Sequence, residues 1–234
     1  MGKRLIQQRR GKGSMVYKAL KHQSKGKAKH AKVNATEDGI VKDIITSRFH
    51  SAPLLKIQYT DGEKLMISPE GIRIGDTIES NTTNLKIGNT LALRDIPEGT
   101  LIYNIEKVFG DGGKFVRASG NFARVTQKTS KGITIIMPSK ATKIFNEGCR
   151  ATIGIVAGGG RKEKPLMKAG NKFHLMKAKH KLYPKVCGIS MNAVDHPFGG
   201  KCSHIKGRPT QSSRHAPRGR KVGKIAPKRT GMKR

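Results

Sequence analysis

The positive charge of this chain is concentrated at its two ends, and this distribution limits where a core can form. The 234 residues carry a formal net charge of +33. Residues 1–32 contain 11 Lys or Arg and no acid, and residues 161–234 contain 21 Lys or Arg and two acids. The intervening residues 33–160 hold 16 basic and 13 acidic residues. Segments so rich in one charge cannot bury enough apolar surface to fold alone, so we expect long irregular basic N- and C-terminal extensions over 1–32 and 161–234.

Composition narrows the class of protein further. Hydrophobic residues make up 35% of the chain, against about 45–50% in average globular domains. No apolar run approaches the ~20 residues of a membrane span, and residues 1–10 lack the apolar stretch of a secretory signal. The three cysteines, Cys149, Cys187 and Cys202, are odd in number and scattered. We therefore expect a cytoplasmic protein from a reducing compartment, with no membrane partner.

The central segment is predicted to be mainly β. Short apolar runs alternate with turn signals such as Thr60-Asp61-Gly62 and Pro97-Glu98-Gly99, and no long amphipathic helix is visible. A polar stretch near 80–88 divides the runs into two small barrels, which we place at 33–84 and 85–160. We expect strands at 40–45, 54–59, 64–68, 72–78, 89–94, 100–106, 121–128, 133–137, 139–145 and 151–157. Residues 168–181 can form a short basic helix with a solvated face.

A charge of this size calls for a polyanionic partner, of which nucleic acid is the commonest. Glycine allows close approach of the backbone to phosphates, and Lys and Arg neutralise them. A chromatin-type architectural protein would share the charge but need not contain two strand-rich barrels. A membrane-active protein would need an amphipathic face, which neither extension has. The candidate phosphate contacts are Arg9, Arg10, Lys12, Arg161, Lys162, Lys168, Lys172, Arg208, Arg214, Arg218, Arg220 and Lys221.

Three consecutive glycines, Gly158 to Gly160, precede Arg161 and Lys162. A nucleotide-binding P-loop requires Gly-Lys followed by Ser or Thr, which is missing, and Pro165 removes a backbone donor. Two alternatives remain open, a solvated turn at a strand end and a backbone hairpin pressed into nucleic acid. The second is favoured because this loop opens the basic C-terminal extension.

An Asp–His pair, Asp195 and His196, lies in the Pro/Gly-containing loop 188–200, with Ser190 nearby. Adjacent residues do not supply the geometry of a hydrolytic triad, and no nucleophile elbow is present. Two other interpretations stay open. The pair can hydrogen-bond a tight loop, or His196 and Asn192 can contact RNA bases or the 2′-hydroxyl.

Metal and aromatic patterns are weak. Cys187, His196, Cys202 and His204 match no usual zinc-ligand spacing, so we expect no metal and no cofactor. Phe109, Phe115, Phe122 and Phe145 lie in or beside predicted strands and are expected in the core. Phe173, Tyr183 and Phe198 lie in basic surroundings, where they can stack on bases or anchor the extension.

Several stretches, taken together and in order, resemble the ribosomal L-two family of the large subunit over essentially the whole chain. They are Gly2–Arg4 with Gln8–Ser14, Ile40–Ile44, Ile87–Asn89 with Ile96–Thr100, Arg117–Ala123, Val156–Arg161, Lys164-Pro165, Lys168–Gly170, Met191–Pro197 and Arg214–Gly223.

The resemblance implies an OB-like barrel followed by an SH3-like barrel, with extensions threaded into ribosomal RNA. It implies a structural protein and not an enzyme, which binds large-subunit ribosomal RNA near the peptidyl transferase centre. Its partners would be that RNA, neighbouring ribosomal proteins and, through the intersubunit face, the small subunit. The loop of Met191, Asn192, Asp195 and His196 would lie towards the centre, with His196 as structural support.

The sequence departs from the commonest family pattern at a few positions. Phe198 and Lys201 stand where many members have His and Gly, and Ala193 stands where bacterial members usually have Pro. The insertion that eukaryotic members usually carry near Asp61 is missing. These departures favour an archaeal type of ribosomal protein.

Overall fold

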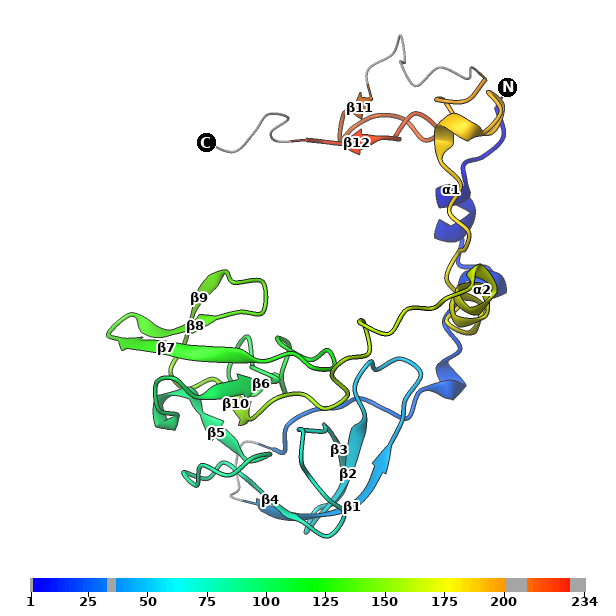
Figure 1. Ribbon diagram of the computed structural model, residues 1–234. Coiled ribbons are helices and arrows are strands. Elements are labelled where there is room, and N and C mark those ends of the chain that lie inside the picture. Colours follow the sequence, from blue (N-terminus) through cyan, green and yellow to red (C-terminus); the bar gives the residue numbers. More distant parts are fainter. Residues whose placement is uncertain (1, 33–36, 201–209, 228–234) are drawn as a thin grey trace. The chain divides into compact units, whose positions relative to one another are not determined.

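Ten strands between Glu37 and Ile153 form one sheet (Figure 1). The computed structural model describes residues 2–32, 37–200 and 210–227. The chain divides into two compact units, which we call the β unit, residues 21–165, and the terminal unit, residues 1–20 with 166–234. The strands are β1 (Glu37–Ile45), β2 (Leu54–Tyr59), β3 (Gly62–Ile67), β4 (Thr77–Ser80), β5 (Thr90–Ala92), β6 (Leu101–Tyr103), β7 (Ala123–Thr129), β8 (Gly132–Ile136), β9 (Thr142–Phe145) and β10 (Arg150–Ile153).

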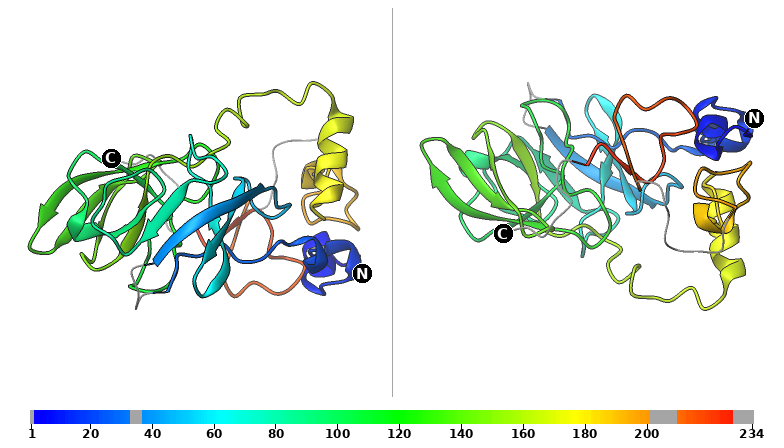
Figure 2. Two further views of the ribbon diagram at one scale, coloured as in Figure 1. Left: turned by 90° about the horizontal axis from the view of Figure 1, so that it is seen from below. Right: turned by 90° about the horizontal axis from the view of Figure 1, so that it is seen from above.

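The strand order is β3-β2-β1-β4-β5-β10-β6-β7-β8-β9. Neighbouring strands are antiparallel except β4 and β5, which join through the single parallel pair Ser80–Thr90. This weak link falls beside the polar stretch near 80–88, where the sequence divides two groups of strands. β1–β4 lie towards one end of the β unit and β7–β9 towards the other (Figures 1 and 2).

The β unit has two apolar cores, and β2 contributes to both. Leu55, Ile57 and Tyr59 point to one face and pack with Val41, Met66 and Ile78. Leu54 points to the opposite face and joins the larger core built from β5–β10. Alternate side chains of a strand lie on opposite faces, so an unbroken Leu-Leu pair marks a strand that is buried on both sides.

The mainly β prediction is confirmed, and each predicted strand range contains or overlaps an observed strand. The observed strands are generally shorter than predicted, because the backbone bends into turns near Gly75, Pro138 and Gly154. Closure into an OB-like and an SH3-like barrel stays a prediction, since β1–β10 form one continuous sheet.

Two of the four phenylalanines that we expected in the core lie on the surface instead. Phe145 is buried, and its ring packs edge-to-face on Phe115 with centroids 5.4 Å apart. Phe109 and Phe122 are 55% and 41% exposed. The prediction is wrong for these two because both follow or precede strands in loops that turn outward.

A strap formed by residues 26–32 packs into the β unit, although charge counting assigns it to the N-terminal extension. Ala28, His30 and Ala31 are buried. The Lys29 N–H donates to the Leu65 carbonyl at 2.9 Å, and the His30 N–H donates to the Gly112 carbonyl at 3.2 Å. The β unit therefore begins at Lys21 and not at residue 33. Small or buried residues alternate with lysines in the strap. A count of net charge registers the lysines but not the burial of the residues between them, so it places the boundary too late.

The buried cation of Arg150 holds the strap in place. Arg150 Nη2 lies 2.8 Å from Glu106 Oε1, and both side chains are almost fully buried. Arg150 Nη1 donates to the Ala31 carbonyl at 2.9 Å and to the Asn81 amide oxygen at 3.0 Å. Burial opposes ionisation of Glu106, but the hydrogen bonds from Arg150 outweigh it and keep the pKa of this carboxyl below its usual value.

His30 is the other buried polar group of the strap. Its Nε2 lies 2.7 Å from the Asn104 carbonyl oxygen, so this nitrogen carries the proton and donates. Burial, reinforced by the nearby Arg150 cation, lowers the pKa of His30 from 6.5 to about 4. The imidazole is therefore neutral near pH 7.

The terminal unit contains short elements and little core. They are α1 (Ile6–Gly11), η1 (Met15–Tyr17), α2 (Ala169–Ala178), η4 (Gly188–Ser190), β11 (Gln211–Ser212) and β12 (Lys224–Ile225). The short helix expected within 168–181 is confirmed by α2, which has no buried residue. Two further short helices, η2 (Lys21–Gln23) and η3 (Leu93–Asp95), belong to the β unit.

We expect Arg150→Met to destabilise the protein by about 3–5 kcal/mol, because it leaves the Glu106 carboxylate buried without its partner. Denaturant unfolding followed by far-UV circular dichroism measures the loss. The control is Arg94→Met, whose guanidinium lies 3.7 Å from Asp95 on the surface and should cost less than ~1 kcal/mol. Equal losses for the two variants would contradict the role of the buried pair.

We expect stability to fall as the pH drops from about 6.5 towards 4, because the unfolded chain then binds a proton at His30 that the folded chain excludes. The His30 contribution is complete above pH 6.5, and the total loss is on the order of 3 kcal/mol. The slope of unfolding free energy against pH should be flatter in His30→Gln than in the parent. His22→Gln, which changes an exposed imidazole, is the control, and a parent-like slope in His30→Gln would disprove the assignment.

Candidate nucleic-acid interface

The N-terminal segment is tied to the 188–200 loop within the terminal unit. The Lys3 N–H donates to the Val194 carbonyl at 2.8 Å, and Lys3 Nζ lies 3.7 Å from the Asp195 carboxylate. Leu5 is buried, and its N–H donates to Gln8 Oε1 at 3.0 Å where α1 begins. Residues more than 190 positions apart in the sequence thus come together.

A pocket of about 310 Å³ lies between α1 and this loop, and we call it the loop pocket. Four of the predicted RNA-contacting residues line it: Arg9, Met191, Asp195 and His196. Asn192 is exposed on the same loop. The structure therefore brings the N-terminal extension together with the Asp–His loop of the C-terminal extension.

A second and larger groove, of about 700 Å³, lies between α1 and the C-terminal tail, and we call it the tail groove. Its described lining includes the cations Arg4, Lys12, Arg218 and Lys221 and no acidic residue. Three of these four were predicted as phosphate contacts. Arg4 was missed, although it stands beside Lys3 in a segment without acids, and it also lines the loop pocket.

The 188–200 loop is held by its own backbone. The Asn192 carbonyl accepts the N–H groups of Asp195 and His196 at 3.0 and 3.1 Å. His196 Nδ1 accepts the Phe198 N–H at 3.0 Å. A Cβ at Gly188 would overlap the His196 imidazole, so glycine is required there. Of the alternatives for this pair, the geometry favours His196 as a structural part of a tight loop.

Phe198 anchors the loop. Its ring packs against His196 with centroids 5.2 Å apart. A Cβ at Gly223 would lie 3.1 Å from the Phe198 ring, so the ring also lies against the tail. Of the three aromatics in basic surroundings, Tyr183 lies under Lys172 Nζ at 5.4 Å from the ring centroid. Phe173 is 43% exposed on α2.

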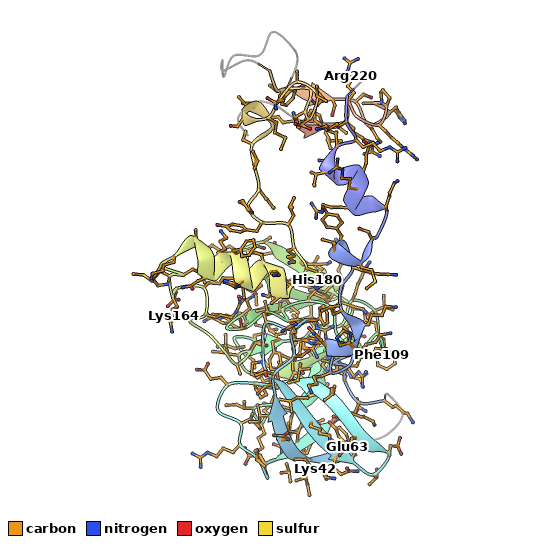
Figure 3. All side chains as sticks on the ribbon, turned by 90° about the vertical axis from the view of Figure 1, so that its right-hand side faces the viewer. Lys42, Glu63, Phe109, Lys164, His180 and Arg220 are labelled. Carbon is orange, nitrogen blue, oxygen red and sulfur yellow. The ribbon has the colours of Figure 1, made fainter. Side chains whose placement is uncertain are left out.

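The remaining predicted cations are presented to solvent. Lys168 and Lys172 lie at the start of α2, and Arg10, Arg214 and Arg220 are exposed in the terminal unit (Figure 3 labels Arg220). Lys221 is half-buried, and Arg208 lies outside the described residues.

Arg161 and Lys162 belong to the β unit and not to the terminal unit. Arg161 Nε donates to Ser119 Oγ at 3.0 Å. A Cβ at Gly120 would lie 2.7 Å from the Gly159 Cα, so the three-glycine loop is packed closely against a second loop. A turn, and no helix, follows the glycines, which excludes the P-loop arrangement.

A further basic surface was missed by the sequence analysis. Residues 122–146 of β7–β9 and their turns contain five Lys or Arg and no acid. All five are exposed: Arg124, Lys128, Lys131, Lys140 and Lys143. We call this surface the basic sheet. Averaging the charge over residues 33–160 hides it, because acids cluster before residue 107.

The β1–β3 face differs from the basic sheet because its acids pair with lysines. Glu63 lies 2.8 Å from Lys56 and 3.7 Å from Lys42 (Figure 3), and Asp61 lies 3.0 Å from Lys32. Hydrogen bonds from Lys56 and Lys32 lower the pKa of Glu63 and Asp61, respectively. This face is close to neutral and is a poor site for a polyanion.

In the described part of the chain, no group of three or more His, Cys, Asp or Glu side chains comes together to hold a metal ion. Cys202 and His204 of the weak zinc pattern lie outside the described residues. None of the described helices is long and apolar enough to span a bilayer.

Comparison with known proteins decides the family. Residues 86–220 match the family described as Ribosomal Proteins L2, C-terminal domain. The chain belongs to the ribosomal L2 family. The large ribosomal subunit protein uL2 of Methanosphaera stadtmanae is 51% identical, that of Methanobrevibacter smithii 49% and that of Methanocaldococcus jannaschii 48%. In each case the alignment covers 100% of both chains.

Membership of the L2 family confirms the resemblance and its archaeal type. The family consists of structural components of the ribosome and not of enzymes. The hydrolase hypothesis built on Asp195 and His196 is therefore wrong. RNA binding and participation in translation are general properties of this family.

Proposed function

We propose that this chain is a structural constituent of the large ribosomal subunit that binds large-subunit ribosomal RNA near the peptidyl transferase centre. The observation that carries the proposal is the tail groove. It brings Arg4 and Lys12 of one extension beside Arg218 and Lys221 of the other, with no acid in its described lining. Four converging cations suit the closely spaced phosphates of folded RNA.

The two units differ in what stabilises them. The β unit is held by two cores and a buried ion pair, so it needs no partner to order it. The terminal unit has short helices, and only Leu5 and Val222 of its described apolar side chains are buried. RNA that closes round its cations would supply the stabilisation that a core does not.

The 188–200 loop supports the placement near the peptidyl transferase centre. Its backbone bonds and the Phe198–His196 contact fix its shape in advance, so it can offer the exposed Asn192 to RNA with little loss of entropy. Peptide bond formation would be left to RNA, and His196 would support the loop.

The basic sheet supports a separate contact with the small subunit. It lies on the β unit, carries five exposed cations, and is distinct in sequence from the extensions. A protein with two separate basic surfaces can bind large-subunit RNA through one surface and contact the small subunit through the other. Its partners are then large-subunit RNA, neighbouring ribosomal proteins and the small subunit, on ribosomes of the cytoplasm.

Binding of the purified chain to deproteinised large-subunit RNA should be stronger than binding to duplex DNA at the same salt. With on the order of ten phosphates neutralised, log affinity should fall with log salt at a slope of about −7 to −9. Substituting Gln for Arg4, Lys12, Arg218 and Lys221 together should make the slope less steep by about 3, as filter binding over a salt series would show.

The matched control replaces four cations of the basic sheet, Arg124, Lys128, Lys131 and Lys140, by Gln. This variant should bind large-subunit RNA with the same slope of log affinity against log salt as the parent, because its tail groove is intact. Equal affinity of the parent for duplex DNA, or equal loss in both variants, would contradict the proposal.

Crosslinking of assembled ribosomes, with both partners mapped, tests the location. We expect Asn192 to crosslink to peptidyl transferase RNA, and Lys131 and Lys140 to crosslink to the small subunit. The last two crosslinks should vanish when the subunits are separated. Crosslinks confined to the β unit, with a silent terminal unit, would disprove the division of labour.

A further inference from the structure

Phe109 is an exposed aromatic on a loop that is unusually well fixed. The side chain is 55% exposed and its neighbour Val108 is 63% exposed. Single apolar side chains on a surface are ordinary and need no explanation. Here two large ones are adjacent, and the loop that presents them is held from both sides.

Two carboxylates fix this loop, which runs from Lys107 to Gly113. Glu106 accepts the N–H groups of Gly110 and Gly112 at 3.1 and 3.0 Å. Asp111 accepts those of Lys107, Val108 and Gly113 at 3.0, 3.4 and 2.9 Å. Gly110, Gly112 and Gly113 all adopt left-handed φ, between 81° and 94°, which lets the chain fold around the carboxylates.

The exposed charged side chains next to the loop are lysines. Lys107 and Lys114 flank it and are exposed. The stem of Lys29 from the strap lies against Gly112, where a Cβ would sit 3.0 Å from the lysine side chain. Partial burial opposes ionisation of Asp111, but its backbone donors outweigh this and hold the pKa of the carboxyl below its usual value. The oxygens of Asp111 are thus engaged inside the loop.

We infer that Phe109 is a stacking platform for an unpaired base of ribosomal RNA (Figure 3 labels the side chain). A flat apolar ring offers a surface for a base of any sequence, and Lys29, Lys107 and Lys114 suit the phosphates on either side of it. A fixed loop loses little entropy when the base stacks. The inference rests on the proposed function, since it assumes RNA as the partner.

An apolar pocket of a neighbouring protein is the competing occupant. The observations favour RNA because Lys107 and Lys114 lie in or beside the loop and Lys29 packs on Gly112 of the same loop, whereas an apolar pocket gains nothing from these cations. The two occupants respond differently to side-chain shape. A base needs a π face, and an apolar pocket accepts any side chain of similar volume.

The experiment compares the full-length parent with Phe109→Ala, Phe109→Leu and Phe109→Tyr for binding to deproteinised large-subunit RNA at fixed salt. We expect Ala and Leu to weaken binding by about 5-fold to 100-fold, and Tyr to bind as the parent does. The salt slope should stay unchanged in all three, because no phosphate contact is lost. Denaturant midpoints should match the parent, since the side chain is exposed.

Short-wave ultraviolet crosslinking of the same complexes gives a direct readout, with Phe109 attached to one nucleotide in the parent. Parent-like affinity of Phe109→Ala or of Phe109→Leu for this RNA would overturn the inference, because a stacked base needs the aromatic ring. If the parent itself does not prefer ribosomal RNA to duplex DNA, the proposed function fails. If the parent does prefer ribosomal RNA and Phe109→Ala binds that RNA with parent-like affinity, only the stacking inference fails.

Discussion

The buried ion pair of Arg150 and Glu106 joins parts of the β unit that are far apart in the sequence. Its guanidinium reaches the Ala31 carbonyl across 119 residues and the Asn81 amide across 69. Two charges removed from water are costly unless every hydrogen-bonding position is used. Here every guanidinium nitrogen donates and both carboxylate oxygens accept, with partners from the backbone and from side chains, so the surrounding segments must be in place together.

Two features with consequences for function depend on this pair. The strap of residues 26–32 is held by Arg150 and by the buried His30, and it lies near the start of the β unit. The 107–113 loop is held by the carboxylate of Glu106 from the other side. A single electrostatic centre thus orders both the entry of the N-terminal extension and the presentation of Phe109.

The terminal unit is organised by a different principle. Only Leu5 and Val222 of its described apolar side chains are buried, and α1 lines one pocket with the Asp–His loop and another with the tail. Most of its cations stay exposed. A segment of this kind gains its stability from a polyanion, and the family to which the chain belongs provides ribosomal RNA as that partner.

Four features can be predicted from residue order alone: the mainly β centre, the short basic helix α2, the basic character of both ends and, through the resemblance, the L2 family. These depend on local alternation, turn residues and residue order, which are visible along one dimension. Three other features become visible in the folded chain: residues 26–32 belong to the β unit, Lys12 lines one groove with Arg218 and Lys221, and Phe109 lies outside the core. Each of these depends on contacts between distant residues, or on the direction in which a loop turns, and averaging charge or hydropathy along the chain removes both signals.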